Sequence, residues 1–418
     1  MRRATLIAAC LLAGALPAAG AAVAAAGAAG APSSRTASVT LAATPNPSVA
    51  SEPTLLTGRV TGPGAGDATV TLWRRGSTAH ATMLAQVNAD GAGAFVFTRT
   101  DAPLDTNETV YASALGARSR SVTEQVAAAV TLSAQTTAAM SGVPVALSGT
   151  VDPTGHTGEA VLVQERDSGA WKTIGRASIT AAGTFALSAT FTGASIVVLR
   201  AELAADSRNE AAHSDPLDLV VSAPQRAGLS LVASSDPIVA GTPVTLSGTL
   251  ASRDAGATVT LLAGPPSQTP GAIATTTTDA SGNFSFTEMP LGDTVYRVSA
   301  EHLQSAPVVV GLRPTVALRS SALVGPLGQT LTFAGTAAGA GVGGSVDLQL
   351  LGDDGNFHTV ARGVLDAGGG AGPAFSLPAM LTDPGARTYR VLVDDGSAWM
   401  SGVSGSITVS VASRAGGG

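Results

Sequence analysis

The chain has 418 residues, including 50 Gly, 23 Pro and 1 Cys, and only 12% of its residues are charged. This length exceeds one ordinary domain, and a hydrophobic content of 45% excludes disorder caused by low hydropathy. A formal net charge of −6 provides no positive field for a phosphate backbone and argues against a nucleic-acid partner.

The first segment, residues 1–31, predicts a secretory signal peptide. Arg2 and Arg3 precede an apolar run, and small residues such as Ala19 follow Pro17, in the order of charged end, apolar core and cleavage region. A retained membrane anchor is the alternative, although Ala, Gly and Pro17 make the run weakly apolar. We therefore expect an extracellular or cell-surface protein with no membrane span after signal cleavage.

Cys10 is the only cysteine and lies within this run. Ile7, Ala8, Ala9 and Cys10 have the form of a lipobox, but the apolar stretch before Cys10 is short and more of the run follows it. We interpret Cys10 as an ordinary signal-peptide residue, with lipidation as the alternative. Cleavage would leave an exported protein without cysteine, which excludes disulfide bonds.

After the predicted signal peptide, one sequence motif recurs four times, as PTLLTGRV, PVALSGTV, PVTLSGTL and QTLTFAGTA. The copies recur about every 90 residues, the size of a small domain. Each copy is followed by an alternating strand, then by a phenylalanine shortly after a glycine turn (Gly-x-Phe in three copies and Gly-x-x-Phe in the fourth), and then by a strand headed by Tyr or Leu. The shared positions are Gly58, Gly149, Gly248 and Gly335, then Phe95, Phe185, Phe284 and Phe375, then Tyr111, Leu199, Tyr296 and Tyr389.

These landmarks predict an all-β fold of four tandem domains with about seven strands each. Apolar and Ser/Thr positions alternate with period two, Gly, Pro, Asp and Asn separate the segments, and no amphipathic helix follows the signal. Seven short antiparallel strands in this length are typical of a β-sandwich. The predicted divisions are signal peptide 1–31, repeat 1 at 36–128, repeat 2 at 129–223, repeat 3 at 227–312, repeat 4 at 313–412 and a flexible tail at 413–418.

The repeats resemble the bacterial Ig-like and fibronectin-type-III-like modules of secreted and cell-surface proteins. The segment LGDTVY ending at Tyr296 is the most specific match, because such modules often place a tyrosine there whose hydroxyl hydrogen-bonds to nearby backbone. Tyr111 and Tyr389 match this position, whereas Leu199 departs from it. Lys172 is the only lysine, and with the abundance of Ala and Gly the composition resembles that of GC-rich actinobacterial genomes.

The third repeat is also similar to carboxypeptidase-regulatory and collagen-adhesin-B-type modules, which have a transthyretin-like strand order. The sequence leaves both sandwich types open.

No residues form a motif that predicts chemistry. The five histidines have no zinc-ligand spacing, so we interpret them as solvated loop residues. No serine lies in a G-x-S-x-G elbow. Asp353-Asp354-Gly355-Asn356 superficially resembles a calcium loop but lacks its spacing, and a hairpin turn explains it. We therefore expect no catalytic residue, no cofactor and no metal ligand.

Trp399, in GSAWMSG, is the candidate binding residue, since exposed aromatics bind sugar rings or protein pockets. We favour partial burial of Trp399 within its module, with exposure on a loop as the alternative that would make it a binding residue. The expected function is that of a non-catalytic secreted or cell-surface protein acting as structural spacer or adhesion module. The alternative is a protein that binds glycan or cell-wall polymer. The expected partners are an extracellular protein or a cell-surface polysaccharide, and an enzyme or enzyme accessory chain is a further alternative.

Overall fold

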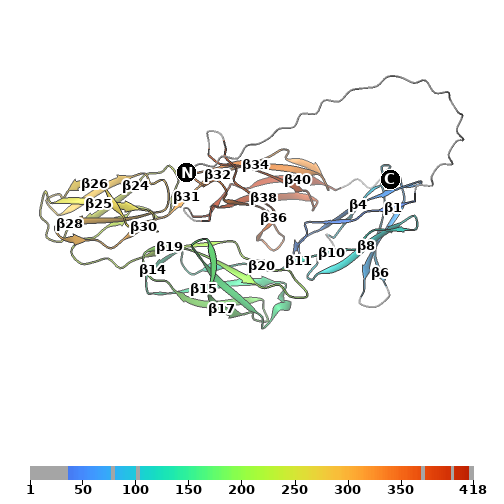
Figure 1. The fold of residues 1–418 in the computed structure, drawn as a ribbon, viewed down its shortest axis with the longest axis horizontal. Coiled ribbons are helices and arrows are strands. Elements are labelled where there is room, and N and C mark those ends of the chain that lie inside the picture. The colour runs from blue at the N-terminus through green and yellow to red at the C-terminus, as the bar shows by residue number, and fades with distance from the viewer. Residues whose placement is uncertain (1–35, 77–80, 100–103, 369–371, 397–399, 414–418) are drawn as a thin grey trace, which may run out of the picture. The chain divides into compact units, whose positions relative to one another are not determined.

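The computed structural model describes residues 36–76, 81–99, 104–368, 372–396 and 400–413. The chain divides into two units, Met1–Thr36 and Ala37–Gly418, and the second contains the four repeats. Apart from a 3-10 turn at Thr154–His156, the regular elements of the described residues are strands (Figure 1). The prediction of an all-β chain is confirmed. In this part of the chain, no helix has the length and hydrophobicity that a bilayer crossing requires. The predicted signal peptide and Cys10 lie outside the described residues.

Repeat 1 forms two antiparallel sheets. One has the order β1-β4-β2 with β7 beside β4, and the other has the order β10-β8-β5-β6 with β9 beside β8. In the same repeat, β3 and β11 form a separate parallel pair. The bounds are β1 Ser38–Val39, β2 Ala42–Thr44, β3 Ser48–Val49, β4 Leu55–Thr61, β5 Thr69–Arg75, β6 Ala81–Asn88, β7 Ala94–Thr98, β8 Glu108–Ala114, β9 Ala117–Arg118, β10 Val122–Glu124 and β11 Val126–Ala127.

Repeat 2 has sheets of order β12-β15-β13, with β18 beside β15, and β14-β21-β19-β16-β17, with β20 beside β19. All seven strands that its sequence pattern predicts are present. The bounds are β12 Ala129–Val130, β13 Ser133–Ala134, β14 Ala138–Met140, β15 Pro144–Asp152, β16 Ala160–Asp167, β17 Ala170–Ser178, β18 Thr184–Thr190, β19 Ser195–Leu203, β20 Ala212–His213 and β21 Leu217–Ser222.

Repeat 3 has sheets of order β22-β24-β27 and β26-β25-β28-β29, with β30 beside β28, and β23 pairs with β31 in parallel. The bounds are β22 Val232–Ala233, β23 Ile238–Val239, β24 Val244–Thr249, β25 Thr258–Gly264, β26 Gly271–Thr277, β27 Asn283–Glu288, β28 Thr294–Ala300, β29 Leu303–Gln304, β30 Val308–Val310 and β31 Leu312–Arg313.

Repeat 4 has sheets of order β32-β34-β37 and β33-β40-β38-β35-β36, with β39 beside β38. The bounds are β32 Thr315–Ser320, β33 Val324–Pro326, β34 Thr330–Ala338, β35 Ser345–Leu351, β36 Phe357–Val364, β37 Ala374–Met380, β38 Gly385–Asp394, β39 Gly402–Val403 and β40 Ile407–Ala412.

The same strand order recurs in every repeat and is that of an Ig-like sandwich. We number the seven main strands of a repeat in chain order; in repeat 2 they are β13, β15, β16, β17, β18, β19 and β21. The first, second and fifth main strands share one sheet, and the third, fourth, sixth and seventh share the other. Ig-type sandwiches likewise place strands A, B and E in one sheet and C, F and G in the other. A short segment after the first strand also pairs in parallel with the last strand, as β33 does with β40. Of the two sandwich types that the sequence leaves open, the structure has the Ig-like one.

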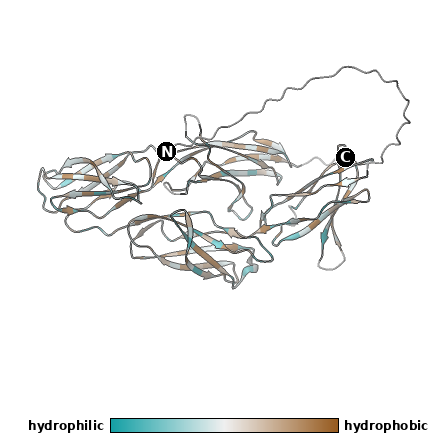
Figure 2. Cartoon of the chain, viewed as in Figure 1, coloured by the Kyte–Doolittle hydropathy of each residue, from teal (hydrophilic) through white to brown (hydrophobic). Residues whose placement is uncertain are grey.

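Each repeat has its own apolar core, built from the inward rows of its strands. Apolar and hydrophilic residues both occur along the strands in Figure 2, as expected for sheets with one face buried and one solvated. A further cluster joins residues of repeats 2, 3 and 4, namely Val220, Val295, Val309 and Met400. Every sheet lies within one of the four sequence ranges, and the domain boundaries themselves stay predictions.

The tyrosines that carry the family resemblance are core residues. Tyr111, Tyr296 and Tyr389 are buried in the sixth main strand of their repeats, as is Leu199 in repeat 2. Burial raises the pKa of Tyr296 and of Tyr389 to about 12. In the described part of the chain, none of the three hydroxyls hydrogen-bonds to backbone in the way that the resemblance implies.

A buried serine makes the corresponding bridge in every repeat. Its Oγ accepts a hydrogen bond from a backbone N–H of the sixth strand and donates to the carbonyl of the residue after it. These serines lie at the start of the segment SRSV, SDPL, SAPV or SGSI. They are Ser119, Ser214, Ser305 and Ser404.

Candidate functional site

The candidate binding residue Trp399 lies outside the described residues, so its expected partial burial and its alternative exposure both stay untested. The other two tryptophans are held by their own repeats. Trp73 donates from Nε1 to Ser113 Oγ at 2.8 Å and stacks on Tyr111. Trp171 packs against the guanidinium groups of Arg166 and Arg200, whose Cζ atoms are 4.7 and 4.3 Å from the centroid of its ring.

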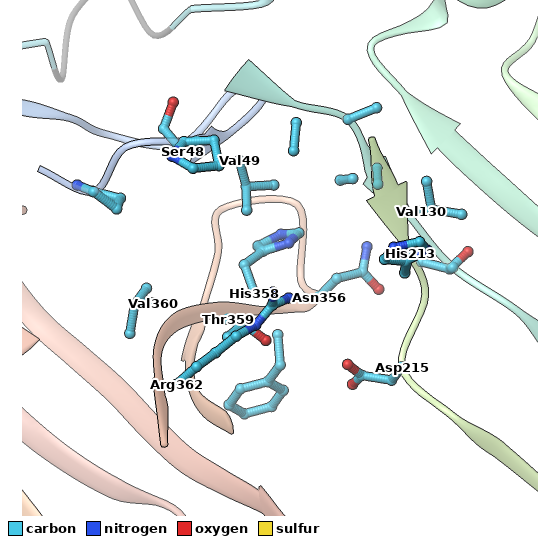
Figure 3. A pocket seen from close by; sticks show the side chains of 18 of the residues that line it. Ser48, Val49, Val130, His213, Asp215, Asn356, His358, Thr359, Val360 and Arg362 are labelled. Atoms are coloured by element: carbon cyan, nitrogen blue, oxygen red, sulfur yellow. The ribbon is translucent and has the colours of Figure 1, made fainter. Parts of the chain in front are cut away.

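The candidate site is a cavity of about 650 Å³ within the second unit, lined by residues of repeats 1, 2 and 4. Repeat 1 supplies 45–49, repeat 2 supplies 129–132 and 211–213, and repeat 4 supplies 356–362. A volume of this size suits a small ligand or a segment of a polymer. In Figure 3, the β35–β36 hairpin carries Asn356, His358 and Arg362 between Val49 of repeat 1 and Asp215 of repeat 2.

One wall of this cavity is an ion-pair network between repeats 2 and 4. Gln349, which is fully buried, donates from Nε2 to both carboxylate oxygens of Asp215 at 2.8 and 2.9 Å. Arg390 donates to Gln349 Oε1 at 2.7 Å and lies 3.4 Å from Asp215 Oδ2. Its guanidinium covers the Phe357 ring at 3.8 Å. The wall is therefore held by hydrogen bonds between side chains of the two repeats.

The same constellation exists inside repeat 2. Gln164 on the third main strand accepts from Arg200 Nε at 2.8 Å, and Arg200 covers the Trp171 ring. There the arginine pairs with Glu202 of its own repeat, at 3.2 Å. In repeat 4 the corresponding arginine, Arg390, instead contacts Asp215 of repeat 2, so the same arrangement of side chains joins two repeats.

The charge of the cavity comes mainly from arginines. Burial lowers the pKa of the His213 imidazole, and the nearby Arg200 and Arg362 lower it further against the opposing effect of Glu202. The ring is consequently neutral at neutral pH. The Arg362 side chain is largely exposed, and its Nε lies 3.7 Å from Asp347 Oδ1.

Two histidines differ from the sequence expectation of solvated loops. His156 is 1% exposed and His358 is 9% exposed. His156 Nδ1 lies 2.9 Å from Glu159 Oε2 and 3.3 Å from Arg208, so this cluster already contains a cation. The expectation was wrong here because neighbouring chain segments, which a local pattern does not reveal, cover both rings.

His358 is in contact with carboxylates of two repeats. Its Nε2 lies 3.0 Å from Asp354 Oδ1 and 3.4 Å from Glu52 Oε1. Burial raises the pKa of Glu52 to about 7, with His358 opposing and Asp354, Asp353 and Asp383 adding to the rise. The predicted hairpin turn at Asp354 is present, with Asn356 N donating to Asp354 Oδ1 at 2.9 Å.

A second set of polar contacts joins repeats 2 and 4 away from the cavity. Arg166 makes a two-pronged ion pair with Asp394, with Nη1 donating to Oδ1 at 2.7 Å and Nη2 donating to Oδ2. Asp218 accepts from the backbone N and the Oγ of Ser401 at 2.9 and 2.7 Å. Burial raises the pKa of Asp218, although these hydrogen bonds act in the opposite direction. These partners are far apart in the sequence, and no spacing rule indicates them.

Comparisons with known proteins add little to this geometry. No family model matches the chain, and no curated protein matches it. Among solved structures, a marsupial T cell receptor is similar with 10% identity and a TM-score of 0.26, over 65% of this chain and 98% of that one. The I9–I11 tandem of titin is similar with 11% identity and a TM-score of 0.18, over 68% and 100%.

Identities and scores this low carry no argument about function. The assignment rests on the strand order and its fourfold recurrence, which make the chain a tandem array of Ig-like β-sandwich modules.

Proposed function

We propose that this chain is a non-catalytic extracellular or cell-surface protein in which four Ig-like modules form a structural and adhesive array. The observation that carries the proposal is the set of partly buried charged contacts between repeats 2 and 4, above all Arg166 with Asp394 and Asp215 with Gln349. Such contacts favour a fixed array that presents its surfaces together over a string of independent spacers.

Export is the first point to test, because the proposal requires it. The full chain is expressed in a bacterium with a general secretion pathway, and the mature N-terminus is sequenced from the medium and envelope. The proposal expects cleavage near residue 31 and protease sensitivity on intact cells. A full-length product confined to the cytoplasm would contradict it.

Adhesion is tested with beads coated with the full chain and presented to purified extracellular matrix, envelope protein and intact cells. We expect saturable retention that survives Trp399→Ala and is reduced by Arg166→Ala, because the array depends on the repeat 2–4 contacts. Retention that is the same for wild type and Arg166→Ala would show that these contacts do not matter for adhesion.

The second candidate is binding of a glycan or cell-wall polymer, and the cavity favours it. Asn356, His213 and Arg362 are polar groups on the lining of a preformed hollow, as in many ligand sites. Retention on insoluble polysaccharide that is lost in Arg362→Ala would support polymer binding in the cavity. Loss of retention in Trp399→Ala alone would place binding at Trp399. No retention of the folded protein would exclude polymer binding.

A further inference from the structure

We propose that Glu52, Asp354 and His358 form a binding site for a divalent transition-metal ion of the zinc class, with ligands from repeats 1 and 4. Glu52 follows β3, Asp354 lies in the turn between β35 and β36, and His358 is on β36. One ligand atom from each residue lies within 4.8 Å of the others. This site is independent of the proposed function.

Two of the three separations between the ligand atoms are close to those around a tetrahedral ion. Zinc binds imidazole nitrogen and carboxylate oxygen at about 2.0–2.2 Å, so two ligands of a tetrahedral zinc lie about 3.3 Å apart. His358 Nε2 lies 3.0 Å from Asp354 Oδ1 and 3.4 Å from Glu52 Oε1. Hydrogen bonds from the imidazole to the carboxylates would have the same separations, and zinc titration distinguishes a metal site from such hydrogen bonds.

The donor set indicates the class of metal. Calcium takes six to eight oxygen ligands and magnesium keeps an octahedral oxygen shell. An imidazole nitrogen with two carboxylates instead suits zinc and its first-row neighbours. Three protein ligands leave a fourth position for water.

Neighbouring groups hold the ligands in place. Asn356 donates from its backbone N to Asp354 Oδ1 at 2.9 Å and from Nδ2 to Oδ2 at 2.8 Å, which fixes the carboxylate. Gly352 makes room for the cluster, because an added Cβ would lie closer than 3.0 Å to atoms of Glu52, His358 and Asp354.

The surrounding charge favours a cation. Asp353 and Asp383 act on Glu52 together with Asp354, and Arg387 is the arginine that pairs with Asp353 and Asp383. Asp383 is 3% exposed, and Arg387 pairs with its Oδ2 while its Oδ1 has no hydrogen-bond partner. Carboxylates removed from water are costly unless a positive charge compensates them. Arg387 compensates Asp353 and Asp383, and a bound divalent ion would supply positive charge to Glu52 and Asp354.

Because Glu52 and His358 belong to different repeats, the ion would link repeat 1 to repeat 4. Glu52 is far in sequence from Asp354 and His358, so the unfolded chain does not hold the three ligands together. Metal binding is then selective for the folded array and stabilises it by mass action.

The test is titration of ZnCl₂ into the untagged, chelator-treated full chain by isothermal calorimetry. We expect one equivalent of zinc to bind, with affinity lowered at least about tenfold in Glu52→Gln and in His358→Gln, as loss of a first ligand should exceed the effect of an outer residue. His213→Gln is the matched control, since its imidazole faces a single carboxylate, Glu202 at 3.8 Å. This variant should bind zinc like the wild type.

A second readout covers variants that fold poorly. Cobalt(II) added to the wild type should give the intense visible absorption of a tetrahedral site, and zinc should displace it. Equal zinc affinity in wild type, Glu52→Gln and His358→Gln would overturn the proposal, as would the absence of zinc binding to folded wild type. Preferential binding of calcium would overturn the assigned metal class.

Discussion

Gly248 lies directly opposite Phe284 across the β24–β27 pair, and the aromatic ring covers the glycine where a side chain would stand. A Cβ added at Gly248 would come closer than 3.0 Å to both the Phe284 ring and the Ser230 carbonyl oxygen. An aromatic ring that covers a strand glycine is a known way to fix strand register. The same pairing joins Gly58 with Phe95.

Gly248→Ala should therefore destabilise the protein by about 1–3 kcal/mol, because overpacking forces the ring and the neighbouring strand apart. Gly271→Ala in the same repeat is the control, since nothing lies within 4 Å of its added Cβ. That substitution should be neutral or stabilise by about 0.4–1 kcal/mol through the unfolded state. Urea unfolding of both variants checks the prediction, and equal midpoints would contradict it.

Ser305 is the clearest test of the serine bridge. It is fully buried, its Oγ accepts from Val298 N at 3.0 Å, and it donates to Ala306 O at 2.8 Å. Ser305→Ala leaves the buried Val298 N–H without this acceptor and should cost about 1–3 kcal/mol. Exposed Ser285→Ala on β27 should stay within about 0.5 kcal/mol of wild type. Thermal or urea denaturation measures both, and a wild-type midpoint for Ser305→Ala would show that the bridge contributes nothing.

The sequence predicted the strands well because alternation and turn residues are local signals. Gly248 and Phe284 were both recognised as landmarks, but their pairing across strands depends on register, which alternation alone does not supply. The serine bridge had a signal, Ser-x-Ser/Pro followed by an apolar residue, in all four copies. This pattern does not by itself predict the bridge, because serine is common in strands and loops alike.

The candidate site was beyond prediction for a different reason. Glu52 and His358 meet only because repeats 1 and 4 contact each other, and Arg166 meets Asp394 because repeats 2 and 4 do. Such contacts depend on surfaces that have no periodicity in the sequence. The repeat pattern predicts the four modules but carries no signal for the contacts between them.

The ion pair between Arg166 and Asp394 makes those contacts measurable. Their side chains are 11% and 15% exposed, so each single alanine variant leaves a partly buried charge without its partner. In a double-mutant cycle with Arg166→Ala and Asp394→Ala, we expect a coupling of about 0.5–3 kcal/mol in the free energy of unfolding.

The control cycle uses Arg362 and Asp347, a pair within repeat 4 whose arginine side chain is 73% exposed. Exposed pairs contribute about 0–1 kcal/mol, so this coupling should be smaller. If the Arg166–Asp394 coupling is zero, this ion pair does not stabilise the contact between repeats 2 and 4, and the fixed array in the proposed function loses one of the two contacts that carry it.

Asp293 should make stability depend on pH. Its Oδ1 accepts from Leu312 N at 2.7 Å, and burial raises the pKa of its carboxyl from 3.8 to about 7 despite this hydrogen bond. Asp218, Asp395 and Asp236 add to the rise. The folded state thus holds a proton between these two values that the unfolded state has lost.

By proton linkage, a group with a raised pKa in the folded state stabilises the protein at low pH. The stabilisation from protonated Asp293 is complete below pH 3.8 and is lost as the pH rises to about 7. At about 1.4 kcal/mol per pKa unit, Asp293 alone would lower stability by up to about 4 kcal/mol over this range. Asp293→Asn keeps an acceptor for Leu312 N and carries no charge, so its stability should fall less between pH 4 and pH 7. The measurement is the free energy of unfolding in urea at several pH values. Parallel curves for the two proteins would mean that Asp293 is ionised in the folded state throughout, and that its site is better solvated than its 9% exposure indicates.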